Sequence, residues 1–351
     1  MPAPFSRLLS SGDLVADRRL ELARDYAGAG EAGAAAELME QALELVPGWA
    51  AGWFALGEFR EAAATSEAGA IGTAATGGAA TTGAAEAYRE ALRLDPDDRC
   101  GATLRLALLG AGAMPEAPPP AHVRDLFDGY ADRFEASLVA TLGYRGPEMI
   151  ERLLDAHVAG RRFAAALDLG CGTGLLAPVI RTRVDRLDGV DLAPAMIARA
   201  RVGGLYDGLE VGDAVAAMAV RGAASLDLIT AADVFCYLGD LSAVFAAAAR
   251  VAAPGAVFAF TTEAVGDDEV GDEVVLRTSR RWAHRASHLE RVAAATGFDV
   301  VAVETTLLRR DRGTDIPGHA ALLVRRRAGH VATAEPVSHD REGDAVRLNA
   351  G

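Results

Sequence analysis

A glycine-rich segment is the part of this sequence whose residue types and spacing are best suited to bind a ligand. Residues 164–176 read Ala-Ala-Ala-Leu-Asp-Leu-Gly-Cys-Gly-Thr-Gly-Leu-Leu, an apolar run that leads into three closely spaced glycines. Glycine is needed where a turn adopts positive φ and where a ligand lies against bare backbone. A second acidic residue, Asp191, ends the next apolar run, where its carboxylate can accept hydrogen bonds from both hydroxyls of a ribose. The pattern therefore predicts a nucleoside-binding site.

The spacing of the glycines separates two classes of nucleoside ligand. A dinucleotide-binding turn needs G-x-G-x-x-G, but Leu175 stands where the third glycine is required, and the glycine falls instead at Gly174. Asp168, just before the turn, is a poor neighbour for a pyrophosphate and a good partner for an ammonium group. A nicotinamide-dependent oxidoreductase is therefore the less favoured alternative.

The elements that must position these residues predict an α/β fold. Beyond residue 120, helical stretches alternate with short β-branched or apolar runs, which is the signature of a covered, mostly parallel sheet. The runs are residues 164–169, 187–191, 226–231, 256–262, 300–304 and 321–324. The first run ends at the glycine turn and the second ends at Asp191, so neighbouring strands bring the two parts of the site together.

The first third of the chain has a different pattern, with alternating amphipathic helices that match a tetratricopeptide repeat. The segment W-x2-L-G at Trp53 restarts the pattern, and Pro47 and Pro96 end the two units. These prolines lie farther apart than the roughly 34-residue period of the repeat, so we expect an insertion. Residues 62–83, an Ala/Gly/Thr stretch with few large side chains, are predicted to be this insertion and to form a mobile loop.

Composition suggests five segments along the chain. We expect an N-terminal arm at 1–15, helical repeats at 16–110, a proline-rich linker at 111–120, the α/β domain at 121–327 and a disordered tail at 328–351. Two to three repeat units are near the minimum for a stable array, so this part is expected to lean on the rest of the protein or on another subunit.

The overall composition limits where in the cell the protein is expected and which classes of partner it can bind. The 351 residues carry 35 Lys+Arg against 49 Asp+Glu, a net charge of −14 that opposes binding to nucleic acid. All of the basic residues are arginine and Asn349 is the only asparagine, which excludes a Walker phosphate loop and a Schiff-base lysine. No apolar stretch is long enough to span a membrane and the three cysteines are far apart, so we expect a cytoplasmic protein with no membrane or metal site.

With these motifs in order, residues 123–327 resemble the class I S-adenosylmethionine-dependent methyltransferases, whose first motif is an acidic residue followed by G-x-G-x-G. Further landmarks are Gly212-Asp213-Ala214, the segment from Asp227 to Tyr237, and the turn Ala253-Pro254-Gly255-Ala256. With the repeats in front, the whole chain looks like the bacterial predicted methyltransferases that carry tetratricopeptide repeats. The resemblance implies a Rossmann-like, seven-stranded sheet and S-adenosyl-L-methionine as the cofactor.

The resemblance also assigns residues to the cofactor. The turn from Asp168 to Gly174 corresponds to the loop around the amino-acid portion of the donor, Asp191 to the ribose ligand, and Asp213 to the acid that binds the adenine amino group. An ordinary strand-to-helix turn and a solvated loop carboxylate are the alternatives for the turn and for Asp213. The expected cofactor residues are Asp168, Gly170, Cys171, Gly172, Gly174, Asp191, Leu192, Met196, Asp213, Ala214 and Asp233.

The sequence gives weaker evidence for the residues of the chemical step than for the cofactor residues. Tyr130 lies on a segment that closes over the donor in similar enzymes, and Tyr237, like Asp233, follows the fourth strand toward the reaction centre. His284 and His288 are four apart on an expected helix between strands five and six, where similar enzymes often build the acceptor pocket. The alternatives are an apolar helix stripe for Tyr130, a helix cap for Asp233, a core aromatic for Tyr237, and a surface or capping histidine for His284.

The predicted function is transfer of a one-carbon group from S-adenosylmethionine to a small molecule or a protein side chain, with the repeats recruiting a protein partner or mediating self-association. A second hypothesis is a repeat scaffold whose methyltransferase domain binds the donor without catalysis. Cys236 invites comparison with the nucleophile of cytosine-C5 methyltransferases, but Phe235 precedes it instead of proline, and the acidic charge opposes DNA binding.

Overall fold

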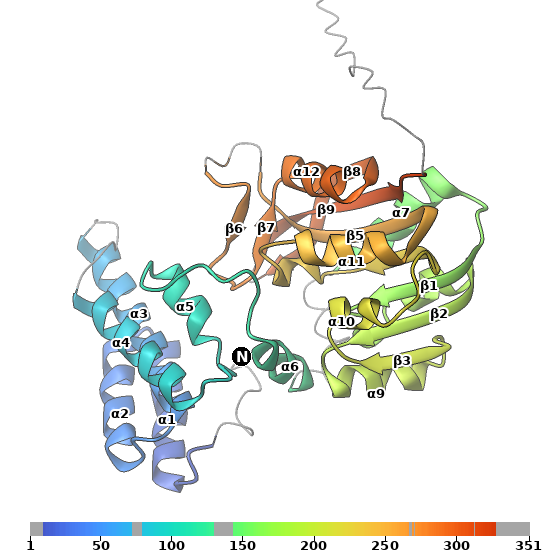
Figure 1. The fold of residues 1–351 in the computed structure, drawn as a ribbon. Helices are drawn as coiled ribbons and strands as arrows, with labels where there is room; N and C mark the ends of the chain where they lie inside the picture. The colour runs from blue at the N-terminus through green and yellow to red at the C-terminus, as the bar shows by residue number, and fades with distance from the viewer. Residues whose placement is uncertain are drawn as a thin grey trace, which may run out of the picture.

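The computed structural model describes residues 10–71, 79–129, 143–266, 269, 271–311 and 313–327. Most of the expected N-terminal arm, the expected tail and Tyr130 lie outside these residues. The described chain forms a helical part followed by an α/β part, which lie side by side (Figure 1).

The helical part consists of five helices that pack through small residues. Ala23, Ala35 and Ala42 are fully buried and allow close approach of neighbouring helices, while Met39 and Tyr88 fill the space between them. Asp13 caps the first helix by accepting hydrogen bonds from two backbone N–H groups. The helices are α1 (Leu14–Gly28), α2 (Ala32–Leu45), α3 (Ala50–Ile71), α4 (Ala79–Leu94) and α5 (Ala102–Leu108).

The loop predicted for residues 62–83 is largely wrong. Helix α3 continues to Ile71 and α4 begins at Ala79, so only residues 72–78 separate the two helices, and these lie outside the described part of the chain. Alanine has the highest intrinsic helix propensity, so an alanine-rich stretch can extend two existing helices although it offers few large side chains for packing.

The α/β part is built on a mixed sheet whose centre is parallel. The strands are β1 (Phe163–Leu169), β2 (Val184–Asp191), β3 (Gly208–Val211), β4 (Leu226–Ala231), β5 (Ala252–Ala264), β6 (Val274–Leu276), β7 (Trp282–His284), β8 (Phe298–Asp311) and β9 (Thr314–Arg325). Their order is β3-β2-β1-β4-β5-β7-β6, and antiparallel β9 joins β5 to β8. All six strands predicted from the sequence are present. The implied count of seven is wrong for the described chain, whose sheet has nine strands.

The two additional strands, β6 and β7, form a short antiparallel hairpin at the end of the sheet. Strand β7 pairs in parallel with the last residues of β5, and β9 occupies the other edge of β5 at the same level. The hairpin therefore lies on the β4 side of β5, just beyond the point where β4 ends. This placement brings it to the carboxyl edge of the parallel strands.

Helices cover both faces of the sheet. They are α7 (Gly146–Val158), α8 (Ala177–Arg181), α9 (Pro194–Gly203), α10 (Ala214–Ala219), α11 (Ser242–Val251) and α12 (Ala286–Thr296). One face is buried under α10, α11 and α12, where Phe235, Phe245, Phe258 and Phe260 form an aromatic cluster. The other face is buried under α7 and α8. No helix among the described residues has both the length and the apolar character that a membrane-spanning helix needs.

The two parts of the chain pack directly against each other. Leu104 and Ala107 of α5 share an apolar cluster with Leu276 and Trp282 of the β6–β7 hairpin. After α5, the linker leads into α6 (Pro120–Asp128), which packs on α9 beside the sheet (Figure 1). The hairpin is thus the element of the sheet that contacts the helical part.

Candidate functional site

A cavity of about 210 Å³ opens at the carboxyl edge of the parallel strands. It lies where β1 is flanked by β2 on one side and β4 on the other, so the strand order reverses at this point. Ligands of open α/β sheets bind in the crevice at such a reversal. The site predicted from the glycine turn therefore coincides with the place that the topology favours.

Most of the predicted cofactor residues line this one cavity. The exception is Gly174, which is outside the lining. The predicted residues in the lining are Asp168, Gly170, Cys171, Gly172, Asp191, Leu192, Met196, Asp213, Ala214 and Asp233.

The glycine turn has the conformation that the sequence requires. Gly170, Gly172 and Gly174 have φ values of +58°, +54° and +95°, in the left-handed region that side chains disfavour. A Cβ at position 170 would stand 2.5 Å from a methyl carbon of Val234. The turn is thus a close-packed backbone surface, and at Gly170 and Gly172 that surface faces the cavity.

Asp168, next to last in β1, is a buried carboxylate held by two hydroxyls. The Tyr206 hydroxyl donates to Oδ2 at 2.7 Å, and the Thr230 hydroxyl donates to Oδ1 at 2.8 Å. Burial raises the pKa of Asp168 to about 6, although both hydroxyls act to lower it, and Asp191 raises it further. The ionised form keeps acceptor capacity for a cation at the cavity wall.

Asp191 ties the glycine turn to the end of β2. Its Oδ2 accepts from the Gly172 N–H at 2.9 Å and its Oδ1 from the Ala193 N–H at 2.8 Å. Burial raises the pKa of this carboxyl, and the two backbone N–H groups lower it. A carboxylate has about four acceptor positions, so these two bonds leave capacity for the hydroxyls of a ligand.

Asp213 has features of both roles considered for it, a ligand of the adenine and a solvated loop carboxylate. It lines the cavity, and it also caps α10 by accepting from the Ala216 N–H at 2.9 Å. Its side chain is exposed, as expected for a cap at the mouth of a cavity. Ala214 follows it in the lining, and Leu192 and Met196 supply apolar surface on the β2 side.

The linker and α6 supply a wall that the sequence did not predict in detail. Pro118, Pro120, Val123 and Phe127 line the cavity. The end of α6 is fixed to the sheet because Asp128 accepts a hydrogen bond from the Ala195 N–H, in the first turn of α9, at 2.8 Å. The resemblance assigned a covering segment here, but the proline run suggested only a spacer.

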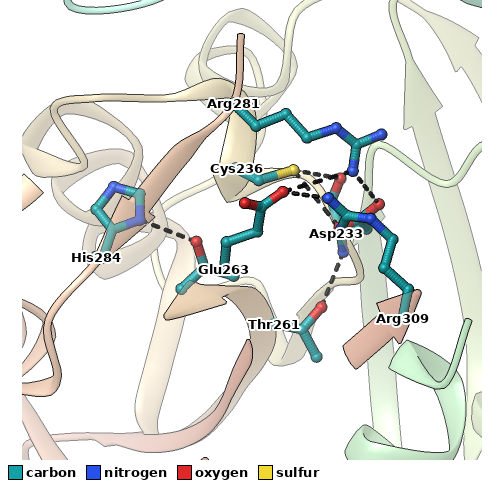
Figure 2. Close-up of polar contacts among 8 residues, drawn as sticks. Asp233, Cys236, Thr261, Glu263, Arg281, His284 and Arg309 are labelled. Atoms are coloured by element: carbon teal, nitrogen blue, oxygen red, sulfur yellow. Dashed lines mark hydrogen bonds and ion pairs between the residues drawn. The ribbon is translucent and has the colours of Figure 1, made fainter. Parts of the chain in front are cut away.

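A cluster of four charged residues borders the cavity after β4. Asp233 accepts from Arg281 at Oδ2 and from Arg309 at Oδ1, both at 3.1 Å, and Arg309 also pairs with Glu263. Figure 2 shows the two guanidinium groups converging on Asp233. Asp233 and Arg281 line the cavity, whereas Arg309 and Glu263 are almost fully buried behind them. The arginines were missed because they come from distant parts of the sequence.

Tyr237 lies in the lining beside this cluster, in the short helix η3 (Phe235–Tyr237). The Arg281 guanidinium stands over its ring at 5.1 Å, and Phe127 packs edge-on against it at 5.5 Å between ring centroids. Burial raises the pKa of the Tyr237 hydroxyl, and Arg281 lowers it. The phenol is therefore protonated at neutral pH.

Tyr144 is a lining residue that no sequence pattern indicated. It is 6% exposed, and its hydroxyl forms no hydrogen bond of standard geometry within the described ranges, although the Thr261 hydroxyl lies near it. Burial raises the pKa of this hydroxyl well above its usual range, Asp233 raises it further, and Thr261 lowers it. A buried hydroxyl with no well-formed hydrogen bond in the wall of a cavity is available to a ligand.

The expected helix carrying both histidines is wrong. His284 belongs to strand β7, is fully buried and is absent from the cavity lining, while His288 lies on α12. The Thr262 hydroxyl contacts His284 Nδ1 at 2.9 Å, and burial lowers the pKa of this imidazole to about 4. Figure 2 shows His284 apart from the charged cluster.

The environment of Cys236 does not suit a nucleophile. Burial raises the pKa of this thiol well above its usual range, and Asp233 raises it further. The thiol is fully buried and is not part of the cavity wall. These properties oppose the comparison with cytosine-C5 methyltransferases.

Comparison with known proteins agrees with this geometry. Residues 142–303 match the family model of a methyltransferase domain. The ubiquinone biosynthesis O-methyltransferase of Hahella chejuensis (strain KCTC 2396) is 33% identical over 137 residues, which cover 37% of this chain and 56% of the relative. The corresponding protein of Paraburkholderia phymatum is 29% identical over 192 residues, covering 49% of this chain and 82% of the relative.

Among solved structures, magnesium protoporphyrin IX methyltransferase from Synechocystis PCC 6803 with bound SAM has a TM-score of 0.44 and 17% identity, over 61% of this chain and 98% of that one. The chain spans only about half the length of several of the curated relatives it matches. Residues 142–303 thus form a methyltransferase domain, for which S-adenosyl-L-methionine is the methyl donor.

The residues at the cavity fit this donor. The glycine turn offers a wall that a Cβ at Gly170 would disturb, Asp168 offers an anion, and Asp191 offers acceptor capacity for hydroxyls. These groups match the ammonium and ribose of the donor in chemical type.

Proposed function

We propose that the protein transfers the methyl group of S-adenosylmethionine to an oxygen atom of a small, largely apolar molecule. The observation that carries this proposal is Asp191, which binds the glycine turn through Gly172 and faces the cavity at the reversal of strand order. The names of the relatives support an oxygen acceptor. The apolar wall from the linker and α6 supports a small molecule over a protein side chain.

Within this proposal, each donor-facing residue has a distinct task. Asp168 pairs with the ammonium group, Asp191 accepts hydrogen bonds from the ribose, and Asp213 accepts from the adenine amino group. Leu192, Met196 and Ala214 flank the adenine. Gly174 acts through the backbone conformation of the turn, since it lies outside the lining.

The bound donor supplies an electrophilic methyl group on a sulfonium. The protein contributes mainly by holding the acceptor oxygen in line with that methyl and by excluding water, because orientation can provide several kcal/mol of the acceleration. Tyr237 and Asp233 border the acceptor end in this proposal. Of the other residues expected to act in catalysis, Tyr130 lies outside the described chain, and His284 lies outside the cavity lining, where its Nδ1 contacts the Thr262 hydroxyl.

The helical part is proposed to be a tetratricopeptide-like module that binds a protein partner or a second copy of the chain. Helix pairs that expose a long surface commonly serve this role. A cytoplasmic location also belongs to the proposal, and three free, buried cysteines support a reducing compartment.

The first experiment is calorimetric titration of S-adenosylmethionine and S-adenosylhomocysteine into the wild type and into Asp191→Ala. We expect binding to the wild type and a loss of at least about tenfold in affinity in the variant, because charged hydrogen bonds contribute ~1.5–3 kcal/mol each. Asp185→Ala is the matched control, since Asp185 lies on the same strand with 64% of its side chain exposed. It should bind both ligands as the wild type does.

The same samples separate the alternative hypotheses. NADH binding without S-adenosylhomocysteine binding contradicts the methyltransferase proposal and favours an oxidoreductase. Donor binding without formation of S-adenosylhomocysteine, across a panel of phenols and carboxylic acids, favours a scaffold with an inactive domain. Thermal unfolding of Asp191→Ala is needed alongside, because this change also removes the partner of two backbone N–H groups.

A further inference from the structure

The charges around the cavity are distributed unevenly. Of the described residues in its lining, four are aspartates and one, Arg281, is a cation. Asp168 and Asp191 lie at the carboxyl ends of β1 and β2, and Asp213 follows β3, so these three mark the donor side. Arg281 directly precedes β7, next to Asp233, and thus stands at the other end of the cavity.

Arg281 is held rigidly by contacts that use one end of its guanidinium. Its Nη1 pairs with Asp233 Oδ2 at 3.1 Å and lies 3.9 Å from Glu263 Oε1, and its Cζ lies over the Tyr237 ring, 5.1 Å from the ring centroid. Each hydrogen bond and ion pair found for the Arg281 side chain in the described chain runs through Nη1. An arginine has five N–H donors, so Nε and Nη2 keep capacity for a further partner.

The carboxylates of the cluster are shared with a second arginine. Arg309 is 2% exposed and pairs with both Asp233 and Glu263 from behind the cavity wall. Arg281 is 20% exposed and borders the open space. The inner arginine therefore takes a large part of the negative charge, and the outer one presents a partly desolvated cation to the cavity.

We propose that Arg281 binds an anionic oxygen of the methyl acceptor, so that the substrate class is an apolar molecule with an acidic hydroxyl or a carboxylate. This proposal rests on the methyl-transfer function proposed above. The apolar body of such a molecule has surfaces to contact in Pro118, Phe127 and Leu238. Tyr144, whose buried hydroxyl lies near Thr261 but forms no hydrogen bond of standard geometry in the described chain, supplies a neutral donor in the same wall.

The reaction balances without a general base in the cavity. A hydroxyl acceptor loses its proton to solvent before the transfer, because the guanidinium favours the ionised form. A lone pair of the oxygen anion then forms the O–C bond while the S–C bond breaks and its electron pair stays on sulfur. The anion and the sulfonium disappear together, which leaves a neutral methyl ether or ester and a thioether.

The test uses 4-nitrophenol, an apolar phenol whose anion absorbs visible light, added to protein saturated with S-adenosylhomocysteine. We expect the wild type to bind the anion preferentially, so that bound 4-nitrophenol ionises at lower pH than the free compound. In Arg281→Gln this shift should disappear and binding of the anion should weaken about 10- to 100-fold, the range for a charge-assisted hydrogen bond. Affinity for S-adenosylhomocysteine should change less than about threefold.

Arg277→Gln is the matched control, because Arg277 belongs to the same hairpin region but pairs with Glu269 away from the cavity lining. It should keep the full shift. Arg281→Lys should restore part of the anion preference, since it keeps the charge but loses the planar fork. Thermal unfolding confirms that each variant is folded.

Three results would overturn the inference: an unchanged shift in Arg281→Gln, equal ionisation of bound and free probe in the wild type, or no probe binding by protein that binds S-adenosylhomocysteine. Failure of the wild type to bind S-adenosylhomocysteine has a different meaning, because it contradicts the proposed function itself.

Discussion

The Tyr206 hydroxyl donates a 2.7 Å hydrogen bond to the carboxylate of Asp168, although the two residues are 38 positions apart in the sequence. Asp168 is next to last in β1, whereas Tyr206 lies between α9 and β3. The ring of Tyr206 also stands 3.2 Å from the position that a Cβ would take at Gly174. One tyrosine therefore holds both the first acid of the motif and its last glycine.

The pKa of Asp168 predicts that donor binding depends on pH. An ammonium group needs the ionised carboxylate, and burial raises the pKa of Asp168 to about 6. We expect affinity for S-adenosylhomocysteine to be constant above pH 7 and to fall up to tenfold per pH unit below about 6. Calorimetry between about pH 5 and pH 8 measures this change in affinity, because that interval is roughly the range over which one such group titrates.

The contribution of Asp168 to the stability of the free protein should change with pH in the direction opposite to its effect on donor affinity. A carboxyl whose folded pKa is raised stabilises the fold when protonated, so its contribution is present below about pH 4 and is lost as pH rises through about 6. Asp168→Asn removes both effects, and comparison with the wild type isolates them from other groups. Equal pH dependence of donor affinity in the two proteins would falsify the assignment of Asp168.

Glycine 170 gives a second prediction. Gly170→Ala places a Cβ 2.5 Å from Val234 at φ +58°, so both the backbone and the packing must shift. We expect a loss of ~2–4 kcal/mol in the free energy of unfolding, as for other severe local strain. Donor affinity should drop at least tenfold, because the turn is the cavity wall. Chemical denaturation and calorimetry give the two numbers.

Gly160→Ala is the control that separates backbone strain from steric conflict. Gly160 has a similar φ of +72°, but its Cβ would meet nothing within 4 Å. We expect it to cost only ~1–2 kcal/mol, the penalty for an L-residue in this conformation. If both variants lose stability equally and bind donor equally, the close approach to Val234 has no role.

The donor side of the site could be predicted from sequence because its signals are local. The apolar run of β1, the glycines at 170, 172 and 174, and Asp191 at the end of β2 each depend on a few neighbouring residues. Parallel pairing of β1 with β2 then brings them together, since carboxyl ends of parallel strands share one edge.

The acceptor side could not be predicted in the same way because it is assembled from distant segments. Strand β7 has only three residues, and it pairs with the end of β5 where a helical spacing of histidines suggested a helix. Arg281 and Arg309 meet at Asp233 although one directly precedes β7 and the other lies in β8. Neither periodicity nor a spacing motif reports such long-range contacts.

The buried hydroxyl of Tyr144 gives a third prediction. Tyr144→Phe removes a hydroxyl that lies near Thr261 but forms no hydrogen bond of standard geometry in the described chain, so the free energy of unfolding should stay within ~0.5 kcal/mol of the wild-type value. Turnover of an acidic acceptor should fall if the hydroxyl binds it. Chemical denaturation and initial rates measure these effects.

Tyr88→Phe is the contrasting control for the same chemical change. The Tyr88 hydroxyl is buried and donates to Glu61 Oε2 at 2.8 Å. Its removal leaves the carboxylate without this donor and should cost ~1–2 kcal/mol. A comparable loss of stability in both variants would mean that Tyr144 has a partner in the folded protein.

The contact between the helical part and the hairpin gives the last prediction. Leu104 is 1% exposed and packs against Leu276 and Trp282, and Trp282 directly follows Arg281 in the chain. Leu104→Ala should lower the free energy of unfolding by ~2–4 kcal/mol, the cost of a buried cavity of this size. Because the change loosens the base of the hairpin, it should also weaken binding of the 4-nitrophenol anion while affinity for S-adenosylhomocysteine is kept. Leu22→Ala, at a position that is 47% exposed on α1, should change stability by less than ~1 kcal/mol and leave both ligands unaffected. If Leu104→Ala destabilises the protein but leaves probe binding intact, the helical part supports the fold of the hairpin region without influencing the cavity.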